Sequence, residues 1–170
     1  SLTDGRDDAL AMIDHAVEGP VVLVGSSMGG WIMLLAALAR PDRVVGMVGI
    51  AAAPDFTDWG FSQPEKLYIL QYNKLERANP YGPAPTVYTR RFWQAGEASR
   101  LMHGPIAIDC PVRLIHGQRD PDVPWAQSVR LAELIRSDDV QVILVKDGDH
   151  RLSREGDIAL LTRTVGDLLP

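Results

Sequence analysis

One short segment of the sequence has the residue types and spacing of a catalytic turn. Gly25-Ser26-Ser27-Met28-Gly29 places a serine two residues from a glycine on either side, after an apolar run and before a Leu- and Ala-rich stretch. A serine on a sharp turn between a strand and a helix exposes its hydroxyl for nucleophilic attack. We expect Gly25 and Gly29 to be needed because the chain approaches itself there too closely for a Cβ. The alternative is a glycine-rich turn that binds an anion or only reverses the chain.

A serine hydroxyl needs a base to take its proton, and imidazole is the side chain that titrates near neutral pH. Among the four histidines, His150 follows an apolar run in the turn-rich loop Lys-Asp-Gly-Asp-His. Such a loop lies at the carboxyl edge of a parallel sheet, where we expect it to face the serine turn. His15 and His103 are expected to have surface or packing roles. His116 ends a predicted strand, where its ring is placed to line the site.

A carboxylate must then hold the tautomer of the histidine and stabilise the imidazolium. Asp120 follows the strand that ends at His116-Gly117, and a tight turn at Gly117 would keep it near the strand end. Asp122 is the rival, but it precedes Val-Pro and can simply cap the next helix. The chain order Ser27, Asp120, His150 is the order in which α/β hydrolases carry their triad.

The backbone N–H of Met28, at the start of the helix after the serine, is the expected first donor to a developing oxyanion. A second donor normally comes from a loop after an earlier strand. The sequence holds four predicted strands and begins with the helix before the serine strand, so we expect the earlier strands and the second donor to lie outside this chain. The sheet edge left open would then pair with a separate N-terminal fragment or with another copy of the chain.

The hydrophobic pattern predicts strands that alternate with helices. The strands are expected at 21–24, 44–51, 112–116 and 140–146, and the helices at 4–18, 31–40, 124–136 and 158–169. The first helix would turn Leu10, Ile13, Ala16 and Val17 to one side, and the run from Val21 to Val24 suits a strand covered on both faces. This order predicts an α/β fold with a mostly parallel sheet and helices on both faces.

The alternation is interrupted by residues 54–109, which are rich in proline and longer than a simple connection. We interpret them as an inserted lid with helices at about 63–78 and 89–102, between core parts 1–53 and 110–170. Nine of the eleven aromatic residues fall in this segment. They favour an apolar acyl pocket, although a short insertion also needs an aromatic core of its own.

Composition excludes some classes of protein. The 17 Lys and Arg are scattered and outnumbered by 22 Asp and Glu, which argues against nucleic acid as a partner. No apolar run approaches the roughly 20 residues that span a bilayer, so we expect no stable membrane insertion. The single Cys110 reads as a small buried hydrophobe in a reducing compartment. These features predict a cytoplasmic protein, and the chemistry considered needs no metal or organic cofactor.

From about residue 8 to its end the chain resembles the α/β-hydrolase superfamily, and within it the abhydrolase-domain mitochondrial acyl-protein thioesterases and their bacterial relatives. The resemblance lies in Val22–Trp31, Ala39-Arg40-Pro41, Cys110–Gly117 with Asp120, Val123-Pro124-Trp125 and Asp149-His150-Arg151. Members of that group remove palmitoyl groups from cysteine and hydrolyse acyl glucuronides. The resemblance therefore implies ester or thioester substrates with an apolar acyl part, and a mitochondrial location for a eukaryotic member.

Together these patterns predict a serine hydrolase that cleaves carboxylic esters or thioesters, of small molecules or acylated proteins, through an acyl-enzyme. The same triad would serve an amidase, a C–C bond hydrolase or a perhydrolase. A protein of another class, a catalytically silent hydrolase-fold binding module, would keep the pocket and lose turnover.

Overall fold

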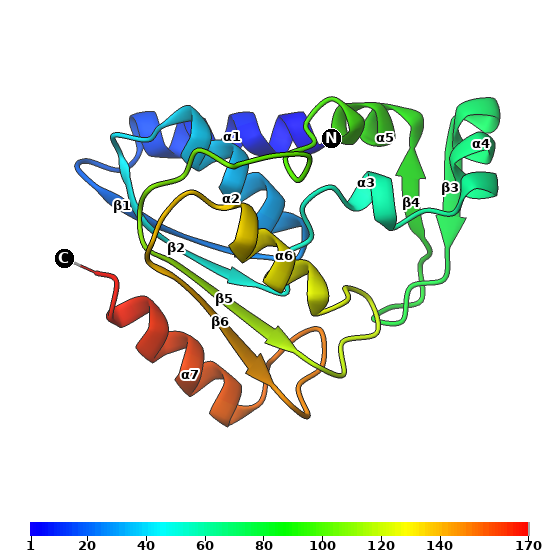
Figure 1. The fold of residues 1–170 in the computed structure, drawn as a ribbon. Coiled ribbons are helices and arrows are strands. Elements are labelled where there is room, and N and C mark those ends of the chain that lie inside the picture. Colours follow the sequence, from blue (N-terminus) through cyan, green and yellow to red (C-terminus); the bar gives the residue numbers. More distant parts are fainter. Residues whose placement is uncertain (170) are drawn as a thin grey trace.

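The computed structural model describes residues 1–169 and is built on a four-stranded parallel sheet. The strands are β1 (Val21–Ser26), β2 (Val44–Ile50), β5 (Val112–Gly117) and β6 (Val140–Val145), and they lie side by side in that order (Figure 1). Because every neighbouring pair is parallel, all four carboxyl ends meet at one edge of the sheet. The four predicted strands are thus present, and their ends differ by one or two residues.

Helices cover both faces of this sheet. The core residues of α2 (Met28–Ala39) and α6 (Ala126–Leu134) pack on one face, and α7 (Glu155–Gly166) packs on the other. Helix α1 (Leu2–His15) packs on α2, away from the sheet. In the part of the chain that the structure describes, no helix has both the length and the apolar character needed to cross a membrane.

Two predictions near the amino terminus were wrong, namely that the first helix reaches residue 18 with Ala16 and Val17 on its apolar side and that the first strand is covered on both faces. Helix α1 ends at His15, and its buried side chains are Leu2 and Ile13, whereas Ala16 lies beyond the helix and Val17 is 43% exposed. Val24 of β1 is 48% exposed, so this strand is not covered on both faces. The reason is position: β1 lies at the edge of the described sheet, and the side chains of α7 pack over residues of β2 and β5 instead. Its pairing with a separate fragment or a second copy stays a prediction.

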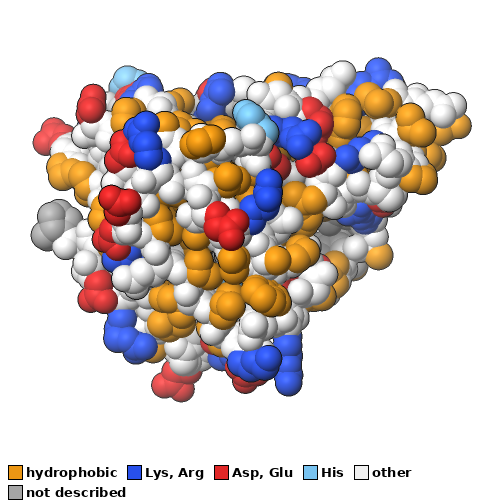
Figure 2. All heavy atoms as spheres, viewed as in Figure 1, with side chains coloured by type: hydrophobic (Ala, Val, Ile, Leu, Met, Phe, Trp, Pro, Cys, Tyr) orange, Lys and Arg blue, Asp and Glu red, His pale blue; other side chains and the backbone are white. Residues whose placement is uncertain are grey.

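Residues 54–109 connect β2 to β5, which are neighbours in the sheet, and we call them the crossover segment. It holds three helices and a two-stranded antiparallel hairpin: α3 (Phe56–Trp59), α4 (Gln63–Tyr72), β3 (Lys74–Arg77), β4 (Thr86–Thr89) and α5 (Arg90–Glu97). The segment projects beyond the sheet on the side toward the strand carboxyl ends (Figure 1). Figure 2 shows hydrophobic side chains gathered over its tip, where Leu67 and Tyr72 of α4 are more than half exposed.

The two long helices predicted for this segment are wrong in extent. Helix α4 stops at Tyr72 because Asn73 adopts a left-handed backbone conformation, with φ of 68°, and closes the helix. The next residues form the hairpin instead of a further helical turn, and α5 ends at Glu97. Phe56, Phe61 and Tyr88 stack edge to face or tilted with centroids 5.0 to 5.8 Å apart, so the segment has an aromatic core of its own.

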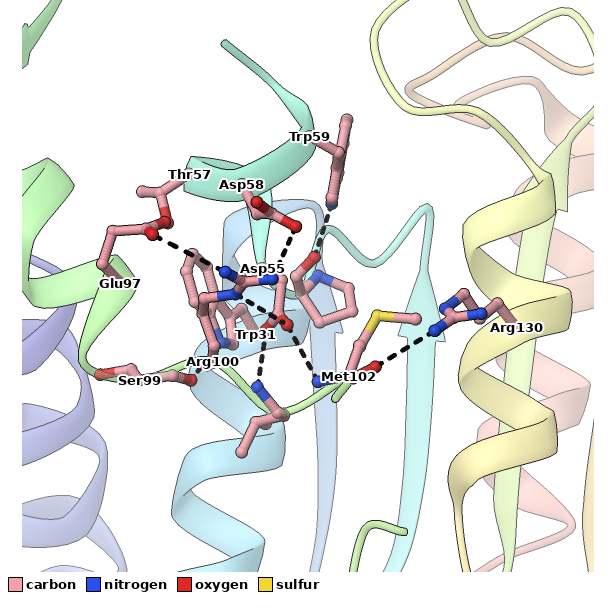
Figure 3. Close-up of polar contacts among 12 residues, drawn as sticks. Trp31, Asp55, Thr57, Asp58, Trp59, Glu97, Ser99, Arg100, Met102 and Arg130 are labelled. Atoms are coloured by element: carbon pink, nitrogen blue, oxygen red, sulfur yellow. Dashed lines mark hydrogen bonds and ion pairs between the residues drawn. The ribbon is translucent and has the colours of Figure 1, made fainter. Parts of the chain in front are cut away.

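A network of polar contacts ties the two ends of the crossover segment together (Figure 3). The Asp55 carboxylate is buried and accepts hydrogen bonds from the N–H groups of Leu101 and Met102, at 2.8 and 2.9 Å. Nearby, Arg100 donates to Asp58 at 2.7 Å, and Thr57 donates to Glu97 at 2.8 Å. The entry and exit of the segment therefore form one structural unit.

Replacing Asp55 with Ala is expected to lower the free energy of unfolding by about 2–4 kcal/mol, because the backbone N–H groups of Leu101 and Met102 would lose their acceptor. Urea denaturation of the variant and the parent protein measures the change. Asp58→Ala is the matched control, since the Asp58 side chain is 42% exposed and an exposed pair contributes about 1 kcal/mol or less. Equal losses for the two variants would contradict a special role for Asp55.

Candidate active site

Ser27 lies in a strained turn between β1 and α2. Its φ of 53° and ψ of −118° lie in a region that residues with a Cβ rarely adopt. Three hydrogen bonds hold the turn: the Ser27 N–H donates to the Ile50 carbonyl at 2.9 Å, and the Ser27 carbonyl accepts from the N–H groups of Gly30 and Ala53, both at 3.0 Å. The strain is therefore maintained by the ends of β2 and α2, and the serine projects from the carboxyl edge of the sheet.

The glycine requirement at this turn was half right. A Cβ on Gly25 would lie 2.4 Å from the Gly29 carbonyl oxygen, so Gly25 is needed for the close passage of the chain. A Cβ on Gly29 would meet nothing within 4 Å, so that part of the prediction is wrong. The tight position is Gly30, where a Cβ would lie 2.5 Å from the Cβ of Ala52. The helix turns Gly29 toward open space and Gly30 toward the end of β2.

The loops that follow β5 and β6 lie against each other. The N–H of Arg119 donates to the Gly148 carbonyl at 2.9 Å, and that of Gln118 donates to the Val145 carbonyl at 2.9 Å. A Cβ on Gly117 would lie 2.3 Å from the Gly148 oxygen, so the two loops can approach this closely only with glycine at position 117. This contact sets the positions of Asp120 and His150 relative to each other.

Asp120 and His150 form a direct pair. Nδ1 of His150 lies 2.8 Å from Oδ2 of Asp120, whose side chain is fully buried, while the His150 side chain is 14% exposed. Burial opposes ionisation of Asp120, but hydrogen bonds from His116, His150 and the N–H groups of Val123 and Asp122 outweigh it and lower the pKa of the carboxyl. The hydrogen bond to Asp120 in turn raises the pKa of His150.

Asp122, the rival acid, has another partner. Its Oδ2 accepts a hydrogen bond of 2.5 Å from the hydroxyl of Tyr81, in the loop between β3 and β4, and this bond raises the pKa of Tyr81 to about 12. Helix α6 begins without a side-chain cap, so the prediction that Asp122 caps it is wrong. The Arg151 guanidinium lies over the Tyr81 ring at 4.4 Å from its centroid. The loop between β3 and β4 is therefore held against the loops that carry Asp120 and His150.

The other three histidines do not reach the cavity at Ser27. His15 and His103 are exposed, as their predicted surface roles require. His116 is fully buried, so the prediction that its ring lines the site is wrong. Its Nδ1 lies 2.7 Å from the Ser128 hydroxyl of α6, and its Nε2 lies 2.9 Å from the Val123 carbonyl. The side chain points into the core under α6.

Ser27, Met28 and His150 line one cavity of about 490 Å³ with residues of the crossover segment. The cavity wall is completed by Ala53, Phe56, Arg77, Ala78, Asn79, Pro80, Tyr81, Thr86, Tyr88, Pro121, Asp122 and Val123. Among the hydrogen bonds of residues 1–169, none joins the Ser27 hydroxyl to the His150 ring. The serine is thus brought to the same cavity as the Asp120–His150 pair without a direct bond to it.

Most of the hairpin residues on this wall were not singled out from the sequence. The signal available was the density of aromatic residues in the crossover segment, and it pointed to Phe56, Tyr81 and Tyr88 only as members of a larger set. Which of them face the cavity depends on the hairpin, which the sequence pattern did not predict.

One group of side chains at the site has the geometry of metal ligands. Ligand atoms of Asp120, Asp122 and His150 lie within 4.8 Å of one another. Each of the three already has a partner: both oxygens of Asp120 accept hydrogen bonds, Asp122 accepts from Tyr81, and Nδ1 of His150 contacts Asp120. A cation bound through Asp120 or through Nδ1 of His150 would have to compete with these bonds, and the prediction of a cofactor-free site remains a prediction.

Met28 is the first residue of α2, so its N–H has no carbonyl acceptor within the helix. Met28 also lines the cavity beside Ser27. The partial positive charge at the amino end of α2 favours negative charge at this point. A second donor outside these residues, as predicted from the sequence, stays a prediction.

A strained serine turn between a strand and a helix, with a carboxylate–histidine pair after later strand ends, is the arrangement of an α/β hydrolase. The family model described as "Alpha/beta hydrolase family" matches residues 1–159, and the chain belongs to that family. The fold predicted from the sequence is therefore confirmed.

Particular relatives point to one branch of this family. The bovine protein named palmitoyl-protein thioesterase ABHD10, mitochondrial, is 44% identical over 172 residues, which cover 96% of this chain and 55% of the relative. The solved structure of mouse alpha/beta hydrolase domain-containing protein 10 has a TM-score of 0.90 at 40% identity, covering 99% of this chain and 69% of that one. A structure from Agrobacterium vitis S4 has a TM-score of 0.93 at 37% identity, covering 100% and 69%.

These relatives confirm the resemblance to the abhydrolase-domain thioesterase branch. The chain spans only about half the length of the curated relatives it matches, at 55% of the bovine protein.

Replacing Asp120 with Asn is expected to lower the pKa of His150, because a neutral amide no longer stabilises the imidazolium. A titration of the His150 ring followed by NMR measures the change. Asp149→Asn is the matched control: Asn keeps the side-chain oxygen that accepts from the N–H groups of Arg151 and Leu152, and only a more distant charge is lost. A pKa of His150 that is unchanged or raised in Asp120→Asn would contradict the pairing.

Proposed function

We propose that this chain carries the active site of a serine hydrolase that cleaves thioesters or esters with an apolar acyl group. The observation that carries the proposal is that Ser27, on its strained turn, lines one cavity with His150, whose ring is hydrogen-bonded to the buried Asp120. The name of the curated relatives, palmitoyl-protein thioesterase, supports a thioester of a long-chain acid as the substrate class.

In the proposed reaction His150 is the general base. Its Nδ1–H donates to Asp120, which leaves Nε2 free of hydrogen to accept the proton of Ser27. No hydrogen bond joins the Ser27 hydroxyl to the His150 ring among the described residues, and catalytic hydrogen bonds of this kind often tighten only when substrate binds. The raised pKa of His150 means that activity is lost as pH falls through that pKa, where the ring is protonated and cannot act as base.

The bonds change in two balanced steps. The Ser27 oxygen bonds to the acyl carbon, the bond from that carbon to the thiol or alcohol breaks, and the proton taken by His150 passes to the leaving sulfur or oxygen. Water then attacks the acyl-enzyme, gives a proton to His150, and releases the acid while Ser27 regains its proton. The Met28 N–H is placed to stabilise the oxyanion in both steps.

The crossover segment serves as a lid in this proposal. Its hairpin forms much of the cavity wall, and the Tyr81–Asp122 hydrogen bond holds the hairpin tip against the loop that carries Asp120. Phe56 and Tyr88 give this wall an apolar part that suits an acyl chain.

Of the two locations predicted from the sequence, the relatives' name supports the mitochondrial one. The predicted cytoplasmic location stays untested.

A fluorophosphonate probe is expected to label Ser27, identified by peptide mapping. Ser27→Ala and His150→Ala should each abolish labelling and lower turnover of an acyl thioester by at least about 10⁴-fold, because the nucleophile and base act as a unit. Ser26→Ala is the matched control and should keep both. Labelling at another residue would defeat the proposal, and ligand binding without product release, unchanged in Ser27→Ala, would indicate a silent binding module.

Acyl-chain selectivity tests the substrate class. For thioesters of one thiol, kcat/KM should rise at least about tenfold from acetyl to octanoyl, because each buried methylene contributes about 0.8 kcal/mol. Phe56→Leu should reduce this ratio, whereas Phe61→Leu, which alters the same aromatic cluster away from the cavity, should reduce stability and leave the ratio unchanged. A preference for anilides over thioesters and esters would identify an amidase instead.

A further inference from the structure

His116 is a buried titratable side chain that the proposed mechanism does not use. It lies near the carboxyl end of β5, immediately before Gly117, and its side chain is 0% exposed. A buried imidazole is costly unless both ring nitrogens have hydrogen-bond partners. Both nitrogens of the His116 ring have polar neighbours, and one of these neighbours is Asp120 of the proposed triad.

The Val123 carbonyl determines the tautomer of His116. It lies 2.9 Å from Nε2, and a carbonyl can only accept a hydrogen bond, so Nε2 must carry a hydrogen. In the neutral ring Nδ1 is then an acceptor, and the Ser128 hydroxyl, 2.7 Å away, donates to it. The ring is thus fixed between the loop after β5 and helix α6.

The same nitrogen also lies against Asp120. Nε2 of His116 lies 3.2 Å from Oδ2, the oxygen that accepts from His150 at 2.8 Å. The other oxygen, Oδ1, accepts from the N–H groups of Asp122 and Val123 at 2.8 and 2.9 Å. Oδ1 therefore has two N–H donors, and Oδ2 contacts two imidazole nitrogens. Rotation of the carboxylate about its Cβ–Cγ bond would break contacts on both sides.

We infer that His116 is a positioning residue that holds Oδ2 of Asp120 in place for the His150 ring, with its own tautomer set by Val123 and Ser128. The inference rests on the proposed function, because it assigns His116 to the support of the same triad. His116 does not line the cavity, so it acts through Asp120 and not on the substrate. Loss of its N–H should change the chemical step and leave substrate binding nearly unaltered.

Two substitutions separate this role from simple packing. His116→Leu removes the contact to Oδ2 and leaves the Asp120 carboxylate less firmly held. It is expected to lower kcat by about 10–100-fold, the loss typical of removing partners that orient metal-binding side chains. KM should stay within about twofold of the parent value, since uniform binding is unaffected. His116→Gln keeps an N–H donor near the position of Nε2 and is expected to restore most of kcat.

An NMR titration of His150 gives a readout that does not depend on turnover. In His116→Leu the pKa of His150 should fall, because the imidazolium loses a fixed carboxylate, and His116→Gln should resemble the parent. The other titratable or charged groups around His150 are unchanged in both variants: Asp122, Asp149, Tyr81 and Arg151. A pKa of His150 that is unchanged or raised in His116→Leu would overturn the inference.

Leu131→Ala is the structural control. Leu131 is a fully buried residue of α6, so its truncation should lower the melting temperature without moving the His150 titration. Failure of the parent protein to react with fluorophosphonate at Ser27 would defeat the proposed function, and the titration would still decide whether His116 positions Asp120.

Discussion

The Asp120 carboxylate is a negative charge buried in the protein, and it is stable there only because donors surround it. Those donors come from several parts of the chain: two N–H groups of its own loop, His116 on β5, and His150 from the loop after β6. The contacts with these donors hold the end of β5 and the loops after β5 and β6 together at the carboxyl edge of the sheet. The same contacts give His150 its orientation and its raised pKa, so one electrostatic constraint determines both the structure and the protonation of His150 at this edge.

The sheet and the general position of the site could be predicted from the sequence because local patterns determine them. Apolar runs that alternate with helical patterns leave a parallel sheet as the arrangement that covers both faces. Parallel strands bring their following loops to one edge, so a serine turn and two distant loops were expected to meet there. Family membership confirms the fold, and the structure places Ser27 and His150 at one cavity.

The details that could not be predicted depend on contacts between distant residues. Lys74 to Arg77 form a strand because they pair with Thr86 to Thr89, although residues such as Lys, Leu, Glu and Arg favour helices when considered locally. Gly30 rather than Gly29 is crowded because the end of β2 passes that side of α2. Burial of His116 likewise depends on α6, which packs over β5, and no property of the strand sequence alone reveals it.

The contact between Asp55 and the returning end of the crossover segment has a consequence for how such proteins diversify. Asp55 bonds to Leu101, a residue 46 positions later in the chain, so the segment leaves and re-enters the sheet layer at nearly one point. Insertions whose ends lie close together can be exchanged without disturbing their host. With its own aromatic core, this segment has the properties of an interchangeable module. Under the proposed function, substrate preference would change there while the strands hold Ser27, Asp120 and His150 in place.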